Sequence, residues 1–128
     1  MNILDKIVAH KKEEVESQKS KVKIEELKDS QFFSRKTLSL REFLLDENKT
    51  GIIAEFKRKS PSKGSINETA AVAEVTKAYT ANGASALSIL TDEHFFGGKS
   101  ADLEAARFNI IPVLRKDFII DEYQVTEA

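Results

Sequence analysis

The first third of the chain places apolar residues among charged ones at the spacing of a surface helix. From Ile3 to about Lys19 the apolar positions that recur at helical spacing are Ile3, Leu4, Ile7, Val8 and Val15. Because lysines and glutamates fill most other positions, this helix is expected to bury one stripe against a later segment. A second, short helix is expected after Ser39, which has the capping-box spacing to Glu42.

After Gly51 the pattern changes to strands alternating with helices. We expect strands over 51–57, 86–90 and 111–115 and helices over about 68–82 and 100–108. Asn82-Gly83 is a typical helix end, because glycine tolerates the left-handed conformation there, and Ser100 is a typical helix start. Asp121 has the spacing to Gln124 of one more helix start. This βαβαβ order predicts an α/β fold with a parallel sheet.

The first predicted strand runs from an apolar segment directly into charged residues. Its apolar start suits a strand buried on both faces, and the two-residue period sends Glu55, Lys57 and Lys59 to one side. Three charges cannot all face a dry core. This segment alone leaves two interpretations open, a ligand-binding site and a solvated rim of ion pairs.

All three predicted strands end in polar residues, and this regularity favours a site. The segments concerned are Glu55 to Ser60, Thr91-Asp92 and Arg115 to Asp117. Carboxyl ends of parallel strands meet at one edge of a sheet, where fixed cations suit a carboxylate or phosphate substrate. A loop of Phe95-Phe96-Gly97-Gly98 would add an aromatic wall beside this edge.

The cations at this edge are expected to divide the work. Glu55, two residues before Lys57, would keep Lys57 charged for anion binding, which leaves Lys116 free to donate a proton. Arg58 and Arg115 alternate out of phase with the lysines and are expected to form salt bridges to the helical shell. Asp92 is also compatible with capping or hydrogen bonding within its loop, and His94 is expected on the loop surface.

Composition narrows the class of protein further. The 128 residues are 41% hydrophobic and carry a net charge of -1, which argues against disorder and against general attraction to nucleic acid or anionic membranes. There is no cysteine, and His10 and His94 are too far apart for a local metal motif. Without a long apolar run or a signal-type start, we expect a soluble, cytoplasmic protein.

Three motifs, in order, are similar to those of a known enzyme family. Ala54 to Ser62, Leu87 to Asp92 and the pattern from Pro112 to Gln124 together resemble indole-3-glycerol phosphate synthase. The resemblance covers essentially the whole chain but about the first half of that family's length. It implies a helical extension over 1–48 and, over 49–128, the first three βα units of a TIM barrel, an incomplete domain that would be inactive alone.

The resemblance also implies a chemistry. The family is a lyase of tryptophan biosynthesis that closes the indole ring of a phosphorylated substrate with loss of carbon dioxide and water, using no metal or organic cofactor. By the resemblance Lys116 is the general acid, Lys57 holds substrate anions and Glu55 orients Lys57 and the substrate. The implied substrate-binding residues are Ser60 and Pro61 in the first loop, Lys59, and the aromatic residues Phe96 and Phe118.

Three other readings stay open. A non-catalytic half-barrel could pair its open sheet edges with a second copy or with the missing half. Another phosphate-binding TIM-barrel enzyme is the nearest enzymatic alternative. RNA or phosphoinositide binding through Lys57, Arg58, Lys59 and Lys63 is disfavoured, because the basic run is short and lacks interleaved aromatics, so neither nucleic acid nor a membrane is expected as a partner.

Overall fold

The computed structural model of the chain describes residues 1–128, which divide into two compact units. The sheet unit comprises Thr37–Asp117, and the terminal unit combines Met1–Lys36 with Phe118–Ala128. This division by compactness does not test the predicted domain limits, 1–48 and 49–128, which stay a prediction. None of the helices is long and apolar enough to cross a membrane.

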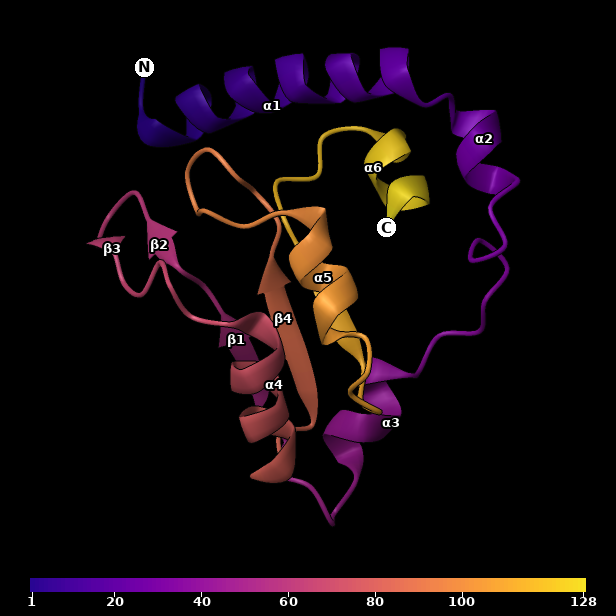
Figure 1. Cartoon of the computed structure of the whole chain (residues 1–128), viewed down its shortest axis with the longest axis vertical. Coiled ribbons are helices and arrows are strands. Elements are labelled where there is room, and N and C mark those ends of the chain that lie inside the picture. Colours follow the sequence, from indigo (N-terminus) through magenta and orange to yellow (C-terminus); the bar gives the residue numbers. More distant parts are fainter. The chain divides into compact units, whose positions relative to one another are not determined.

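The sheet unit is built on three parallel strands in the order β1-β4-β5. Figure 1 shows β1 next to β4. The strands are β1 (Ile53–Phe56), β4 (Ala86–Leu90) and β5 (Val113–Lys116), and the crossover helices are α4 (Val72–Ala81) and α5 (Ser100–Ala106). The predicted βαβαβ order is therefore confirmed. A short hairpin of β2 (Lys59–Ser60) and β3 (Gly64–Ser65) follows β1 and was not predicted.

The central strand carries the core of this unit. All five residues of β4 are buried, and the apolar cluster around Leu87 and Ile89 includes Phe56 from β1 and Val72 from α4. The expectation that the first strand is buried on both faces is wrong, because Ile53, on the same face of β1 as Glu55, is 41% exposed. The apolar face of the sheet thus packs on its helices, and alternation places Glu55 and Ser88 on the other face.

Hydrogen-bonded polar residues hold α4 beneath the sheet. Thr80 Oγ1 donates to Asn109 Oδ1 over 2.7 Å, and the Asn109 amide donates to Thr76 Oγ1 over 3.1 Å. The predicted stop is confirmed, since Asn82 caps α4 and Gly83 follows with φ 94°. The short helix α3 (Leu40–Leu45) starts as predicted at Ser39, whose side chain accepts from the Glu42 amide.

The terminal unit joins the two ends of the sequence. It contains α1 (Ile3–Lys21), α2 (Ile24–Lys28) and α6 (Glu122–Glu127), of which α2 was not predicted. The Tyr123 hydroxyl of α6 donates to the Val22 carbonyl after α1 over 2.7 Å. The expected contact of the first helix with a later segment is therefore confirmed.

Two details of the terminal unit bear on the predicted patterns. In the predicted stripe of α1, Ile7 and Val15 are buried, whereas Ile3 and Leu4 are about half exposed. The predicted start of α6 is confirmed, because Asp121 and Gln124 form a capping box. This cap places the Asp121 carboxylate where an α1 side chain reaches it.

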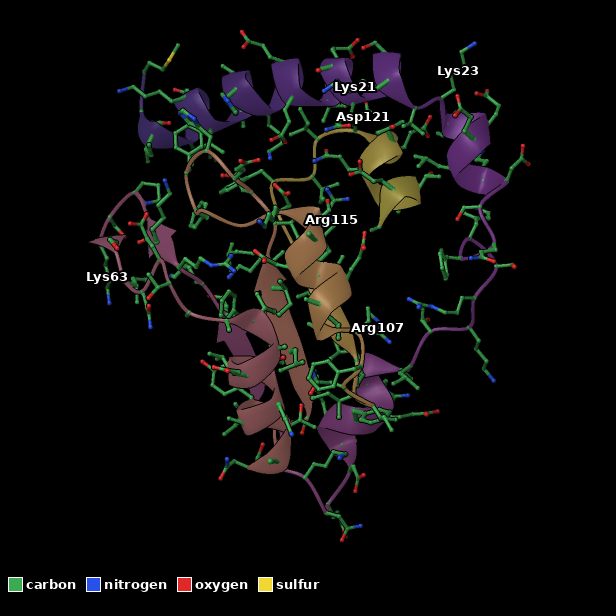
Figure 2. All side chains as sticks on the ribbon, in the orientation of Figure 1. Lys21, Lys23, Lys63, Arg107, Arg115 and Asp121 are labelled. Atoms are coloured by element: carbon green, nitrogen blue, oxygen red, sulfur yellow. The ribbon has the colours of Figure 1, made fainter.

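An ion pair links α1 to the start of α6. Lys19 Nζ lies 2.7 Å from Asp121 Oδ2, and Figure 2 shows Asp121 at the beginning of α6. The hydrogen bond from Lys19 holds the pKa of Asp121 below its ordinary value, and the Tyr123 amide adds to the effect. The same bond raises the pKa of Lys19. Burial raises the pKa of the Tyr123 hydroxyl, and the charges of Glu127 and Glu26 add to this.

We expect this pair to stabilise the terminal unit through the neutral pH range and to weaken at both extremes. A lowered carboxyl pKa adds stability that is lost as the pH falls through the lowered value, and a raised lysine pKa adds stability that is lost as the pH rises through the raised value. Lys19→Met should move the Asp121 carboxyl pKa up toward its ordinary 3.8, as measured by carbon-13 NMR titration. Lys21→Met, two residues along α1, is the control and should leave it unchanged. An equal shift in both variants would contradict the assignment.

Candidate active site

Glu55, Ser88 and Lys116, one residue from each parallel strand, meet on the face of the sheet opposite α4 and α5. Glu55 Oε1 accepts a hydrogen bond from Lys116 Nζ over 2.7 Å and another from Ser88 Oγ over 3.1 Å. The strand register explains the meeting, because Glu55 lies opposite Ser88 on the neighbouring strand. Lys116 ends β5 two positions further along, opposite Leu90, and its long side chain reaches back to the carboxylate.

This pairing differs from the expected one, in which Glu55 holds Lys57. The carboxylate pairs with Lys116, while Lys57 has no hydrogen bond or ion pair. The reason is geometric, since β1 ends at Phe56 and leaves Lys57 beyond the sheet, whereas Lys116 still belongs to β5. The expected pairing is thus wrong, because Lys116 is the lysine that Glu55 holds, whereas the roles expected of Lys57 and Lys116 stay predictions.

The pair combines buried support with an accessible cation. Ser88 is 3% exposed, so its hydroxyl requires a partner within the protein, and the Glu55 carboxylate supplies it. The Lys116 side chain is 54% exposed despite its hydrogen bond. An ammonium group held on a fixed carboxylate and open to solvent can donate a proton or a hydrogen bond to an anionic ligand. Ser88 was missed in the sequence, although one hydroxyl residue within an apolar strand is a detectable signal.

The β2–β3 hairpin carries the other predicted residues of the first loop. Ser60 is buried and its hydroxyl accepts from the Lys63 amide over 3.2 Å, while Pro61 lies exposed in the turn. The half-buried Lys59 lies against the loop after β4, because a methyl group added at Gly97 would come within 3.2 Å of its side chain. The two loops at this edge of the sheet are therefore in contact.

Arg58 joins the same two loops from the helical side. Its guanidinium forms two hydrogen bonds to the Asp102 carboxylate of α5, one of them 3.0 Å long, and donates to the Gly97 carbonyl over 3.3 Å. It also lies 4.9 Å above the Phe56 ring. The predicted salt bridge of Arg58 to the helical shell is confirmed, and this cation is not available to an anion at the site.

The loop after β4 is ordered by a buried carboxylate. Asp92 is 1% exposed, its side chain accepts from the Phe95 amide and its carbonyl from the Gly98 amide, both over 2.9 Å. The loop role expected for Asp92 is confirmed, and His94 is exposed as expected, with its ring edge-on to Phe95. Phe96 lies half buried in this loop.

The remaining predicted site residue falls outside the sheet unit. Phe118 begins the later segment of the terminal unit, so its predicted contact with a substrate ring stays a prediction. No three His, Cys, Asp or Glu side chains come together in a group that could hold a metal ion. The side chains that the strands bring together supply a cation, a carboxylate and a hydroxyl group.

Comparison with known proteins points to a single family. A family model described as indole-3-glycerol phosphate synthase matches residues 4–128. A relative of that name from Bacteroides thetaiotaomicron is 48% identical over 128 residues, covering 99% of this chain and 49% of the relative. Another of that name, from Carboxydothermus hydrogenoformans, is 44% identical over 132 residues, covering 98% of this chain and 50% of the relative. The chain spans about half the length of the curated relatives it matches.

We expect Gly98→Ala to disrupt the loop that carries Phe96. A methyl group at this position would lie 2.0 Å from the Leu90 carbonyl oxygen, so the backbone of the central strand or the loop must move. The free energy of unfolding should fall by about 3 kcal/mol or more in denaturant titration. The control is Gly64→Ala, where φ is 65° and no atom lies within 4 Å of the added methyl, so only conformational strain of about 1–2 kcal/mol is expected. Equal losses in the two variants would argue against a steric cause at Gly98.

Proposed function

The chain belongs to the indole-3-glycerol phosphate synthase family, and we propose that it carries the proton-donating part of that family's active site. The parallel strands and crossover helices are part of the TIM barrel of this family. The proposed reaction converts 1-(2-carboxyphenylamino)-1-deoxyribulose 5-phosphate to indole-3-glycerol phosphate, carbon dioxide and water. The observation that carries the proposal is the exposed Lys116 ammonium held by Glu55 at the carboxyl ends of the strands.

Two steps of this reaction call for a proton donor, the ring closure and the loss of water. The ring carbon that bears the carboxylate attacks the ketone, and the ketone oxygen becomes an alkoxide that must gain a proton. Carbon dioxide then leaves and restores the aromatic ring. The new hydroxyl next gains a proton and leaves as water, while the adjacent carbon loses a proton and the indole double bond forms. Lys116 is proposed to protonate the ketone oxygen, and Glu55 to keep its ammonium in place until then.

The other predicted residues take roles that their positions support. Lys57, which has no protein partner, is proposed to bind a substrate anion, and Lys59 to assist from the hairpin. Ser60 and Pro61 would shape the hairpin turn beside Lys59. The aromatic ring of the substrate would pack on Phe96, with Phe118 as a second aromatic contact. Because Arg58 is engaged by Asp102, the case for a general basic surface that binds RNA or phosphoinositides is weakened.

Self-association through the open sheet edges is a second proposal, for this chain alone. Both β1 and β5 have one strand neighbour in the sheet, and each exposes apolar side chains, with Ile53 41% and Leu114 44% exposed. An exposed edge offers unpaired backbone groups to another strand. A second copy of this chain presents the same strands and is the partner proposed.

Lys116→Met tests the proposed chemistry in a chimera in which residues 1–128 replace the matching half of the Bacteroides thetaiotaomicron relative. We expect kcat for indole-3-glycerol phosphate formation to fall by about 10²- to 10⁴-fold, the usual contribution of a general acid. Lys63→Met, on the exposed hairpin turn, is the matched control and should keep its activity (Figure 2). Undiminished turnover by the Lys116 variant would refute the proposed function.

Ile53→Lys tests edge pairing. Sedimentation of the chain should reveal dimers or larger species, and a charge on the edge strand should shift them toward the monomer. Ile66→Lys is the control, because Ile66 is 50% exposed but follows the hairpin and lies off the three-stranded sheet. A monomeric parent chain at all concentrations would rule out this proposal.

A further inference from the structure

We propose that Thr91 is a positioning residue for Lys116, holding the backbone from which the proton donor extends. This inference rests on the proposed function of Lys116, and Thr91 has no part in that proposal. Thr91 follows the last residue of β4 and is 7% exposed. It touches three consecutive residues of the neighbouring strand end.

Each polar group of Thr91 other than its own carbonyl is engaged with this segment. Its amide donates to the Lys116 carbonyl over 3.0 Å, and its hydroxyl donates to Asp117 Oδ2 over 2.7 Å. The same hydroxyl accepts from Arg115 Nε over 3.2 Å. The Thr91 hydroxyl therefore donates its single proton to Asp117, directly after Lys116, and accepts from Arg115, directly before it.

The need for such a hold follows from where Lys116 lies. The paired register of β4 with β5 ends at Leu90 and Lys116, so no further strand pairing restrains the chain beyond the lysine. The Thr91 side chain extends the restraint by one residue, through the Asp117 carboxylate. Figure 2 shows Arg115 near the carboxyl end of the sheet, consistent with its contact to Thr91.

The side chains on either side of Lys116 are mostly buried, whereas that of Lys116 itself is exposed. The side chains of Arg115 and Asp117 are 12% and 2% exposed, whereas that of Lys116 is 54% exposed. A rigid, buried flank on both sides of an accessible side chain limits the volume that its ammonium explores. Since a displacement of about 1 Å at a catalytic group costs about 10²-fold in rate, loosening this flank should act on kcat.

Thr91→Val tests the inference in the same chimera, since valine matches threonine in shape but lacks the hydroxyl. We expect kcat to fall by about 10- to 100-fold with a smaller change in KM. Thr91→Ser retains the hydroxyl and should recover most of kcat. Amide hydrogen exchange at residues 115–117 should be faster in the valine variant and return toward the parent rate in the serine variant.

Thr76→Val is the matched control for a purely structural effect. Thr76 lies on α4, remote from Lys116, and is fully buried. Its hydroxyl donates to the Val72 carbonyl and accepts from the Asn109 amide. This variant should lose stability without a fall in kcat. If Thr91→Val and Thr76→Val have equal kcat, or serine fails to restore it, the positioning role is overturned while the role of Lys116 stands. If Lys116→Met itself keeps full turnover, the proposed function fails and this inference fails with it.

Discussion

The pairing of β4 with a strand on each side is the constraint on which the sheet unit depends. Because side chains alternate along a strand, the central strand sends Leu87 and Ile89 into the apolar core beneath α4 and α5. The same alternation turns Ser88 to the opposite face, at the level of Glu55. A one-residue slip of this register would move the serine into the apolar core and turn its apolar neighbours away from the helices. Core and site are therefore specified by one set of backbone hydrogen bonds.

The arginines and the lysines at the strand ends make different kinds of contact. Arg58 uses its planar guanidinium for two parallel bonds to the Asp102 carboxylate, a geometry that lysine cannot reproduce. Arg115 bonds to the buried Thr91. Lys116 stays at the accessible side, where Glu55 holds its compact ammonium while the side chain remains 54% exposed. Arginine and lysine contribute the same charge, but here the arginines bond to groups of the protein and Lys116 keeps an accessible ammonium.

Local patterns in the sequence were sufficient for the order of elements and for several ends. The capping box of Asp121 and the glycine after α4 are local signals, and each lies where the sequence predicted it. The two-residue strands of the hairpin and the five-residue α2 are too short to produce a detectable period, so they were missed. Their positions follow from tertiary contacts and not from local propensity.

The candidate site was predictable in its residue types and not in its pairing. Charges after successive strands indicated the edge, and alternation placed Glu55 on the face where Lys116 also lies. Choosing the partner of Glu55 required the distance between β1 and β5 and the point where β1 ends, which no local pattern contains. Lys57 is nearer to Glu55 in the sequence, but Lys116, 61 residues away in the chain, makes the bond.

The contact between Gly97 and the Lys59 side chain links two loops that belong to different βα units. A side chain at position 97 would occupy the volume that the lysine stem now fills, and φ of 68° already disfavours one. These two positions therefore share one volume of space. Within the family they should change together across evolution, with a larger residue at one accompanied by a shorter residue at the other.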